Sequence, residues 1–562
     1  MAQIKSPEEL VKVRQEILAK RDPKKTSISV CVGSNCLASG AAEVMAALQA
    51  ELAKQGLEAD VEARKAGCPG FCEKGPIMVI FPEQICYLQV KPEDAAEIVS
   101  STIKDKKVVE RLLYADPATG EKIVHEYDIP FYKNQKRLVI GDNIKIDPKS
   151  IEDYIAVGGY SALGKVMSGM SQEEVIAEVD KSNLRGRSGS GFPAGFKWDS
   201  CRKSKVEGIK YSICNCHEGD PGAFADRRLL EATPHTVIEG MIIGCYAIGS
   251  AKGYIFVGDE FPQTVANARL AIKQAEEYGL LGKNILGSGF DLSLEVYIDG
   301  GGYVLGESTA LMGSMEGKIG EPRTKYDHGT DRGLRAAPTV LNNLQTWANV
   351  PWIINNGADA FAAIGTGDST GTRVFSIKGK IKNTGMIEVP MGITFREVVY
   401  DIGGGILGDR KFKALEAGGP MGGFIPESLL DTKVDYTEMK KVNLAMGPGL
   451  LVIDEDTCIV DSVRFFLEFL ANESCGKCTP CRDGLRHMLK LLDKIMDGTG
   501  TEKDLELLEL IASVQQDAAL CALGQGASGP LLSTLEHFRD EFMAHIVDKR
   551  CPAGYCKALA KG

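Results

Sequence analysis

The stretch that decides the fold reads LRGRSGSGFPAGFKW and runs from Leu184 to Trp198. Its four glycines fall within ten residues, and Lys197 follows them. Such a loop lets backbone N–H groups approach a phosphate closely, because glycine adopts positive φ at little cost and has no Cβ. Arg187 and Lys197 would add positive charge beside the same anion. The spacing matches neither a P-loop nor the dinucleotide-binding fingerprint, so a glycine-rich surface loop is an equally good interpretation of this stretch alone.

The composition of the whole chain excludes several functional classes. With 562 residues the chain is long enough for several domains. Its formal net charge of −11 gives no electrostatic basis for nucleic-acid binding. No apolar run approaches the roughly 18 residues that a membrane-spanning helix needs, and residues 1–20 read as a charged amphipathic helix rather than a signal peptide. We therefore expect a cytoplasmic protein whose 16 cysteines form metal or redox sites rather than disulfides.

Two glycine-rich loops near the N-terminus carry cysteines in a pattern typical of an iron–sulfur cluster. Cys31 and Cys36 follow one strand-like run, and Cys68 and Cys72 precede another. Four thiolates with nearby backbone N–H donors suit a [2Fe–2S] cluster. Structural zinc is the alternative, but zinc sites favour tighter Cys-x2-Cys pairs. The alternating strands and helices of residues 1–103 predict a small α/β domain, which resembles the thioredoxin-like [2Fe–2S] ferredoxins.

Three further segments accompany the glycine loop in the middle of the chain. An apolar strand leads into Asn215 and the polar run that follows it, and a second glycine loop covers residues 299–306 before a predicted helix. Asn342 and Asn343 precede another helix, and their amides could bind a flavin through donor and acceptor groups. Polar residues just beyond a strand's carboxyl end are where open α/β sheets bind ligands. The four segments together indicate a phosphate-bearing cofactor.

The C-terminal region carries a second cysteine pattern. Cys475, Cys478 and Cys481 form a Cys-x2-Cys-x2-Cys run at the start of a predicted helix, and Cys521 is a remote fourth thiol. This arrangement suits a [4Fe–4S] cluster, whose negative charge the helix N-terminus would stabilise. Zinc is the weaker alternative, because zinc tetrads rarely use such a triplet. Apolar residues at helical spacing predict a bundle over residues 451–562.

A last group of possible metal ligands comprises Cys458, His545, Cys551 and Cys556. Residues of these types can ligate zinc. From the spacing alone, a zinc site and a pair of unligated surface cysteines remain equally open.

Together these motifs resemble the flavoprotein subunit of respiratory NADH dehydrogenase (complex I). They resemble more closely the β subunit of soluble electron-bifurcating hydrogenases and NAD-linked formate dehydrogenases. The resemblance implies a multidomain α/β protein, and it supports zinc at the last group of ligands. The expected order is a thioredoxin-like [2Fe–2S] domain (1–103), a connector (104–150), a Rossmann-like FMN and nucleotide-binding domain (151–365), a β-grasp (SLBB-like) domain (366–450) and a helical [4Fe–4S] domain (451–562).

The resemblance also implies cofactor-binding residues. For FMN these are Gly186, Arg187, Gly189, Gly191, Lys197, Asn215, Glu218, Tyr303, Gly306, Glu307, Asn342 and Asn343. The nicotinamide nucleotide would be lined by Phe192, Lys197, Asp220, Tyr303 and Lys325.

Three departures from the family pattern lie on the nucleotide-facing side of the expected pocket. The family usually has an acid where His217 stands and a second glutamate where Ser308 stands. The family segment whose aromatic residue stacks on adenine reads here Lys325-Tyr326-Asp327-His328-Gly329. None of the three lies in the phosphate loop, so they bear on NAD(H) binding rather than on FMN binding.

The function implied by the resemblance is that of an oxidoreductase subunit of the NADH dehydrogenase type. Hydride would pass between NAD(H) and FMN, and single electrons between FMN and the clusters, without an acid–base catalytic residue. The alternative, motivated by the departures, is an FMN/Fe–S relay that has lost NAD(H) binding and passes electrons between partners or to ferredoxin. Expected partners are a small thioredoxin-like [2Fe–2S] subunit and an Fe–S catalytic subunit such as a hydrogenase, a formate dehydrogenase or another reductase.

Overall fold

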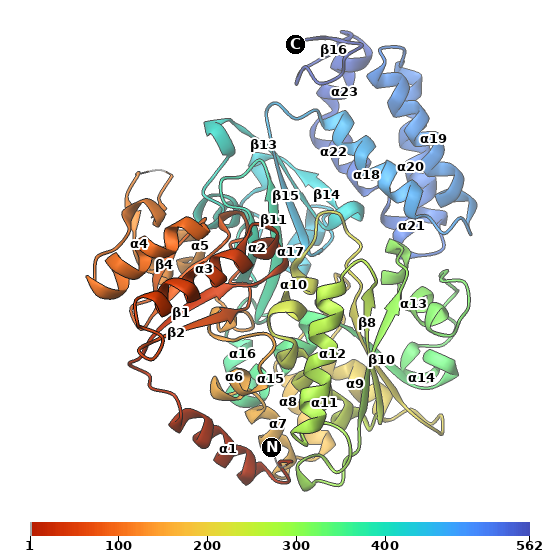
Figure 1. Cartoon of the computed structure of the whole chain (residues 1–562). Coiled ribbons are helices and arrows are strands. Elements are labelled where there is room, and N and C mark those ends of the chain that lie inside the picture. Colours follow the sequence, from red (N-terminus) through yellow and green to blue (C-terminus); the bar gives the residue numbers. More distant parts are fainter. Residues whose placement is uncertain (1–2, 118, 562) are drawn as a thin grey trace.

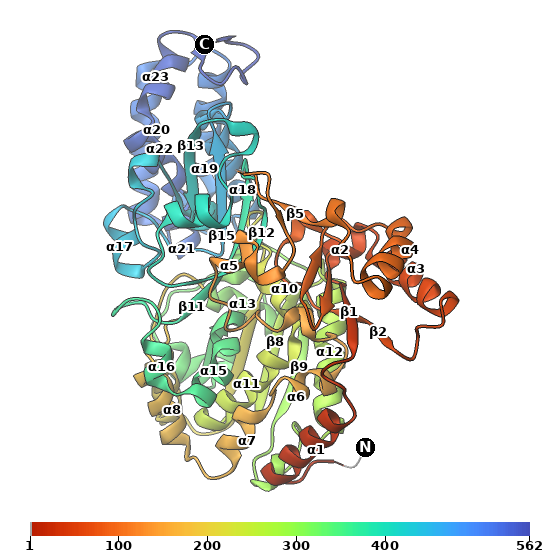
Figure 2. The same cartoon turned by 90° about the vertical axis from the view of Figure 1, so that its left-hand side faces the viewer.

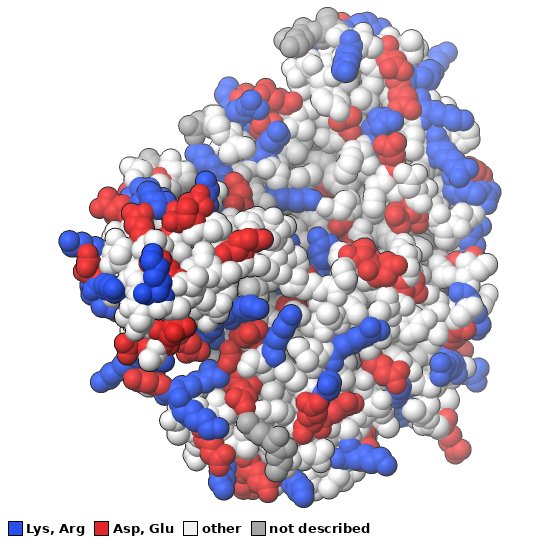
Figure 3. All heavy atoms as spheres, in the orientation of Figure 1, with Lys and Arg blue, Asp and Glu red and all other residues white. Residues whose placement is uncertain are grey.

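The computed structural model describes residues 3–117 and 119–561. Figure 1 shows three regions: an N-terminal domain at one side, a central domain below and a helical bundle at the far end from the N-terminus. The quarter-turn view in Figure 2 shows the same separation of the bundle from helix α1. Among the described residues, no helix combines the length and apolar character that crossing a membrane requires. On the face drawn in Figure 3, acidic and basic side chains are interspersed.

The N-terminal domain is built on a four-stranded sheet in the order β2-β1-β3-β4. Strands β1 and β2 are parallel, and the other pairs are antiparallel. Helix α3 packs beside β2, and the short helix α2 follows β1. The bounds are β1 (Thr26–Cys31), α2 (Ser34–Ala38), α3 (Ala41–Lys54), β2 (Val61–Ala66), β3 (Met78–Phe81) and β4 (Ile85–Tyr87).

Helix α1 (Pro7–Ala19) precedes this domain and packs elsewhere. The Ser6 hydroxyl caps it by accepting a hydrogen bond from Glu9 N. The helix packs against α6 (Ile151–Ala156) and α7 (Ser161–Met167) of the central domain. The sequence analysis places this helix in the N-terminal domain (1–103), but the helix packs against the central domain.

The central domain has a parallel sheet in the order β10-β7-β8-β9. Helices α9, α11, α12 and α15 pack against it, and α11 is buried along almost its whole length. Because all four strands are parallel, their carboxyl ends meet at one edge. The bounds are α9 (Ala194–Arg202), β7 (Tyr211–Cys216), α10 (Ala225–Ala232), α11 (Pro234–Ile248), β8 (Lys252–Gly258), α12 (Pro262–Glu277), β9 (Ser293–Asp299), α13 (Ser308–Met315), β10 (Thr339–Asn343) and α15 (Leu344–Asn356).

A third, five-stranded sheet follows in the order β12-β11-β15-β13-β14. Its bounds are β11 (Thr372–Gly379), β12 (Gly385–Pro390), β13 (Phe412–Ala417), β14 (Gly423–Ile425) and β15 (Gly449–Asp454). One buried apolar cluster runs through this sheet and the N-terminal domain. Met386 N donates to Gly70 O (2.7 Å), and the Phe71 ring stacks on Phe131 of the connector with centroids 4.1 Å apart. The two regions therefore share a single core.

The C-terminal region forms the helical bundle that the sequence predicts. Its helices are α18 (Ile459–Glu473), α19 (Thr479–Met496), α20 (Glu502–Ala518), α21 (Ala522–Gly526), α22 (Gly529–His537) and α23 (Arg539–Ile546). The long helices α18, α19 and α20 bury apolar side chains at helical spacing. Helix α22 packs on β14 and joins the bundle to the third sheet.

Candidate flavin and iron–sulfur sites

A backbone hydrogen bond closes the glycine loop, and the loop packs closely against Tyr436 and Met446, which lie between β14 and β15 of the five-stranded sheet. Gly186 N donates to Phe192 O (2.9 Å). Gly189 and Gly191 have φ of +127° and +61°. A Cβ at Gly189 would lie 2.5 Å from Met446 O, and one at Gly191 would lie 2.7 Å from the Tyr436 ring. Glycine is therefore required here both for backbone conformation and for close approach.

Arg187 uses its side chain to brace this loop. Its Nε donates to Thr372 O (3.1 Å), Nη1 to Arg185 O (3.1 Å) and Nη2 to Thr370 O (2.6 Å). Its backbone N–H donates to Thr346 Oγ1 (3.0 Å). Each guanidinium nitrogen thus already donates to a carbonyl oxygen, whereas the sequence led us to expect that the Arg187 side chain would bind the cofactor's phosphate.

A second buried arginine beside the loop was missed from the sequence. Arg373, on β11, is 1% exposed, and its Nη1 donates to Tyr436 Oη (3.3 Å). Tyr436 Oη donates in turn to Gly186 O (2.7 Å). Arg373 Nε and Nη2 have no hydrogen-bond partner among the described residues. A buried cation with unused donors is costly unless an anion binds there.

The carboxyl ends of β7 and β10 bring the predicted amides together. Asn342 pairs with Cys214 and Asn343 with Asn215 across the two parallel strands. Asn215 Nδ2 donates to Gly306 O (3.4 Å), which connects this edge to the second glycine loop. Lys197 Nζ donates to Leu341 O (3.1 Å) at the same edge. Burial lowers the pKa of Lys197 to about 8, with a further contribution from Lys325.

Glu218 lies at the N-terminus of α10. Its carboxylate accepts hydrogen bonds from Asp226 N (2.9 Å) and Arg227 N (3.0 Å). Burial, and then the neighbouring Asp226, raise the pKa of Glu218 to about 8. Asp226 is itself held by Gln345 Nε2 (2.7 Å) and by the Asn343 amide. The predicted residues Glu218 and Asn343 thus belong to one buried polar network.

The second glycine loop connects the sheet edge to the C-terminal bundle. Tyr303 N donates to Glu473 Oε2 (2.5 Å), and the Tyr303 ring packs edge-on against Phe469 with centroids 5.3 Å apart. Glu307 caps α13 by accepting from Thr309 N (2.7 Å). It also forms an ion pair with Lys325 Nζ (2.7 Å), so a predicted flavin residue contacts a predicted nucleotide residue.

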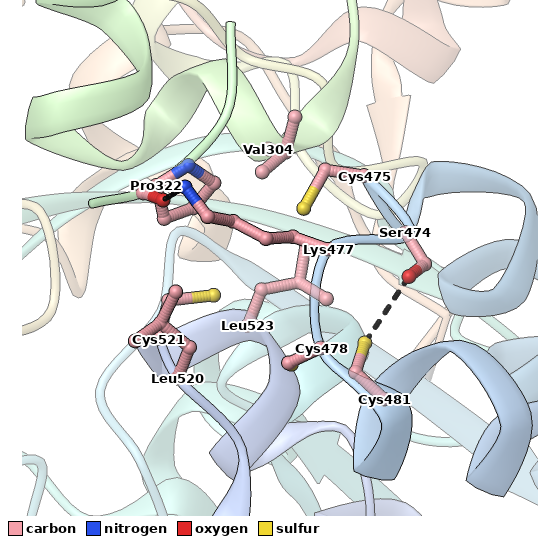
Figure 4. A pocket seen from close by; sticks show the side chains of 10 residues that line it. All are labelled: Val304, Pro322, Ser474, Cys475, Lys477, Cys478, Cys481, Leu520, Cys521 and Leu523. Carbon is pink, nitrogen blue, oxygen red and sulfur yellow. Dashed lines mark hydrogen bonds between the residues drawn. The ribbon is translucent and has the colours of Figure 1, made fainter. Parts of the chain in front are cut away.

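The four C-terminal cysteines line one pocket (Figure 4). Cys475 and Cys521 face each other across it, and Val304 of the second glycine loop closes another side. Cys478 precedes the first residue of α19, so the helix N-terminus points at the pocket. The Ser474 hydroxyl lies 3.2 Å from Cys481 Sγ. The pocket therefore brings together the ligand set expected for a [4Fe–4S] cluster.

The four N-terminal cysteines are all buried. Cys68 Sγ lies 3.9 Å from Cys72 Sγ, and a Cβ at Gly75 would lie 2.7 Å from Cys36 Sγ. Asn143 of the connector donates to Cys68 O (2.9 Å) and fixes one of the two loops. The two loops also meet at Gly33, where a Cβ would lie 3.7 Å from Cys31 Sγ and 3.1 Å from Cys68 Cβ, so the buried cysteines of both loops face the same place.

Comparisons with known protein families agree with this layout. The thioredoxin-like [2Fe–2S] ferredoxin family matches residues 16–102, the Nuo51 FMN-binding domain 179–352, the SLBB domain 374–425 and the NADH-ubiquinone oxidoreductase-F iron–sulfur binding region 461–545. The HndC subunit of the NADP-reducing hydrogenase of Solidesulfovibrio fructosivorans is 48% identical over 428 residues, which cover 76% of this chain and 87% of HndC. The NADH-quinone oxidoreductase-F protein of Escherichia coli is 39% identical over 71% of this chain and 90% of its own length.

The chain belongs to the NADH-quinone oxidoreductase-F family. A solved structure supports the same assignment for the fold: a chain of the NAD+-reducing [NiFe]-hydrogenase in its H2-reduced state superposes with a TM-score of 0.65 at 25% identity, over 96% of this chain and 90% of that one. The family resemblance and the multidomain α/β fold inferred from the sequence are thus confirmed.

We call the edge formed by the carboxyl ends of β7 and β10 the flavin-facing edge, after the FMN-binding domain that this region matches. In this member of the oxidoreductase-F family, the residues predicted to bind the nicotinamide nucleotide differ in exposure. The Phe192 ring is 44% exposed and lies 5.7 Å from Lys197 Nζ, whereas Asp220 is 6% exposed. Burial raises the pKa of Asp220 to about 6. A Cβ at Gly419 would lie 2.3 Å from Asp220 Oδ2, so this carboxylate faces the β-grasp domain closely.

The three departures of this chain from the family pattern have distinct surroundings. Both ring nitrogens of His217 are buried and lack partners among the described residues, and burial lowers the pKa of this histidine. Ser308 Oγ donates to Glu307 Oε1 (3.2 Å). Tyr326 is 91% exposed, so its ring is free to meet a ligand.

The last cysteine and histidine group is assembled in the bundle. The ligand atoms of Cys458, His545, Cys551 and Cys556 all lie within 4.8 Å of one another. Cys458 Sγ lies 3.4 Å from His545 Nε2, and His545 Nδ1 is held by Glu541 O (2.7 Å). Cys551 and Cys556 are both buried, so they are not surface cysteines, and the zinc site stays a prediction.

Proposed function

We propose that this chain is the FMN-containing electron-transfer subunit of a multi-subunit NAD(P)H-linked oxidoreductase. The observation that carries the proposal is the position of the flavin-facing edge between two groups of cysteines. Helix α10 begins at Glu218's hydrogen bonds and runs to the N-terminal group, where Glu231 accepts from Ser34 N (3.2 Å). Val304, next to Tyr303, lines the C-terminal group's pocket. One structural element therefore links the edge to each group.

The residues present fit the cofactors that the family implies. The unused donors of Arg373, beside the glycine loop, suit the FMN phosphate, with Lys197 adding charge. Asn215, Asn342 and Asn343 place polar amides at the edge where the ribityl chain or ring would lie, although each amide already has protein partners. When bound, FMN takes two electrons as hydride and releases them singly to the clusters. The protein's own part is to position, desolvate and separate these groups.

We propose that the nicotinamide nucleotide binds over Phe192, Tyr303 and Lys325. Lys325 supplies a cation, and the exposed Phe192 ring supplies a stacking surface. The similarity to a subunit of an NADP-reducing hydrogenase leaves both nucleotides as candidates. The departures at His217, Ser308 and Tyr326 favour a second candidate function, an FMN/Fe–S relay without nucleotide binding.

Anaerobic stopped-flow reduction separates the two candidates. Flavin bleaching by NADH or NADPH supports the oxidoreductase. A chain that holds FMN and both clusters but is reduced by neither nucleotide overturns it in favour of the relay. Lys325→Met should slow reduction by the nucleotide without changing reduction by dithionite. Lys318→Met is the matched control, because Lys318 is also exposed and paired with a glutamate, Glu316.

We further propose that Cys458, His545, Cys551 and Cys556 bind one zinc ion. Four buried Cys and His ligand atoms, with the histidine fixed by a backbone carbonyl, suit a structural zinc site. Metal analysis tests this: Cys556→Ser should lose zinc and keep its iron, while Cys201→Ser, at a buried cysteine outside every group, should keep both. Zinc that is absent from the wild type, or unchanged in Cys556→Ser, rejects the site.

The relatives support a proposal for the partner of this chain. We propose an Fe–S catalytic subunit, such as a hydrogenase or another reductase, because the similar proteins are subunits of a hydrogenase and of NADH-quinone oxidoreductase. A separate thioredoxin-like [2Fe–2S] subunit stays a prediction, although the chain carries a domain of that kind itself. The subunits that copurify with the chain test both expectations.

A further inference from the structure

A buried arginine of the FMN domain faces the N-terminal cysteine group. Arg228, on α10, is 9% exposed. A Cβ placed on Gly33 would lie 3.7 Å from Arg228 Nη1, 3.7 Å from Cys31 Sγ and 3.1 Å from Cys68 Cβ. Arg228 Nε and Nη1 have no hydrogen-bond partner among the described residues. A buried guanidinium with unused donors points to an anionic acceptor at this place.

The contacts of α10 fix this arginine against the cysteine loops. Glu231, one turn beyond Arg228, accepts from Ser34 N (3.2 Å) and also from Thr264 Oγ1 (3.2 Å). A Cβ at Gly67 would lie 2.8 Å from Ala232 O, so helix and loop are in direct contact. Residues three and four apart share one face of a helix. Arg228, Glu231 and Ala232 thus form a single docking face.

Arg228 keeps its positive charge in this buried place. An arginine guanidinium stays protonated in proteins, and Arg228 Nη1 and Cys31 Sγ lie beside the same Gly33 position. Arg228 is therefore a permanent cation beside the four cysteines. Glu231, the nearest carboxylate of the same helix, is already engaged by Ser34 and Thr264.

We propose that Arg228 donates hydrogen bonds to the [2Fe–2S] cluster held by Cys31, Cys36, Cys68 and Cys72 and raises its reduction potential. The inference rests on the proposed function. Reduction adds one electron to the cluster and breaks no bond, and a nearby cation in a low-dielectric site stabilises the added negative charge. Because Arg228 belongs to the FMN domain, the potential of this cluster depends on how the two domains dock.

An EPR-monitored redox titration of the purified full chain tests this role. In Arg228→Met the equilibrium constant for cluster reduction should fall at least tenfold, a shift of about 59 mV to lower potential for one electron. Arg228→Lys, which keeps the charge, should restore most of the difference. The control Arg269→Gln removes an exposed arginine from α12 and should leave the potential unchanged. Equal potentials in Arg228→Met and the wild type would overturn the inference.

A second measurement applies even if Arg228→Met loses its cluster. Wild-type chain labelled with 15N-arginine should show nitrogen coupling to the reduced [2Fe–2S] cluster in pulsed EPR, and Arg228→Lys should lack it. No arginine coupling in the wild type overturns the hydrogen bond. A wild type without any [2Fe–2S] signal overturns the proposed function and this inference with it, whereas a normal signal with an unchanged potential overturns the inference alone.

Discussion

The two groups of cysteines on either side of the flavin edge are held in opposite ways. The N-terminal four are buried, and their loops contact α10 of the central domain, Asn143 of the connector and β12 of the third sheet. In the C-terminal four, Cys475 is exposed and Cys478 and Cys521 are partly exposed. The difference indicates that one cluster is enclosed by the rest of the chain, whereas the other lies where a partner protein can approach it.

The largest expected effect comes from glycines that neighbour the two groups. Gly70 has φ of +107°, and a Cβ there would lie 2.2 Å from Met386 O. Gly70→Ala should therefore lower the free energy of unfolding by about 3 kcal/mol or more. Gly476→Ala, with φ of +76° and its nearest atom 3.9 Å away, should cost only about 1 kcal/mol. Denaturant unfolding of both variants measures this, and equal losses would remove the distinction between the groups.

A second prediction concerns the affinity for FMN at the edge that lies between the two groups of cysteines. Arg373→Met removes two buried, unused donors from beside the glycine loop, so FMN affinity should fall by about 2 kcal/mol, roughly 30-fold. Riboflavin, which lacks the phosphate, should bind the variant and the wild type equally. Arg373→Lys should recover part of the loss. Fluorescence titration of flavin-free chain measures both ligands, and a parallel loss for riboflavin would assign Arg373 to the fold rather than to the phosphate.

Chelation of iron probes the difference in exposure directly. An iron chelator should remove iron from the C-terminal cluster about tenfold faster than from the enclosed one, a difference of roughly 1.4 kcal/mol in barrier. EPR spectra of the two reduced clusters, taken during exposure to chelator, follow each loss separately. Loss at the same rate, or faster loss of the enclosed cluster, would contradict the comparison.

The smallest expected effect is a pH dependence of FMN binding. Burial lowers the pKa of Lys197 to about 8, whereas a bound phosphate favours the charged lysine. Binding above pH 8 therefore takes up a proton, and affinity should fall about threefold between pH 7 and pH 9. Lys197→Met should bind more weakly but lose this dependence. A flat profile in the wild type would separate Lys197 from the phosphate.

The parts of the site that the sequence predicted are those defined by neighbours in the chain. Cysteine spacing identified the groups around Cys31 and Cys475, and the glycine run from Gly186 identified the loop, because each pattern is local. Arg373, whose contacts run through Tyr436 to Gly186, joins residues far apart in the sequence, and no pattern marks it. Arg228 was missed for the same reason.

Other differences between expectation and structure have the same origin. Arg187 was expected to face an anion, but its guanidinium nitrogens hold carbonyls that include those of Thr370 and Thr372. Helix α1 packs on α6 and α7, which the order of segments along the chain did not indicate. The partners of a hydrogen-bond donor such as Arg187, and the helices against which α1 packs, come from distant parts of the chain. A local sequence pattern therefore cannot predict them.

Helix α10 contacts both the flavin-facing edge, through Glu218, and the loops of the N-terminal cysteines, through Glu231. Its eight residues span about 12 Å. Glu218 holds the N–H groups of Asp226 and Arg227 in the first turn of the helix, and Arg228 follows one residue later. One residue inserted between Arg227 and Arg228 would move the later side chains about 1.5 Å along the axis and turn them about 100° around it. Arg228 and Glu231 would then both turn away from their present neighbours. The positions of these side chains along one short helix thereby fix how the flavin edge is oriented relative to the enclosed cluster.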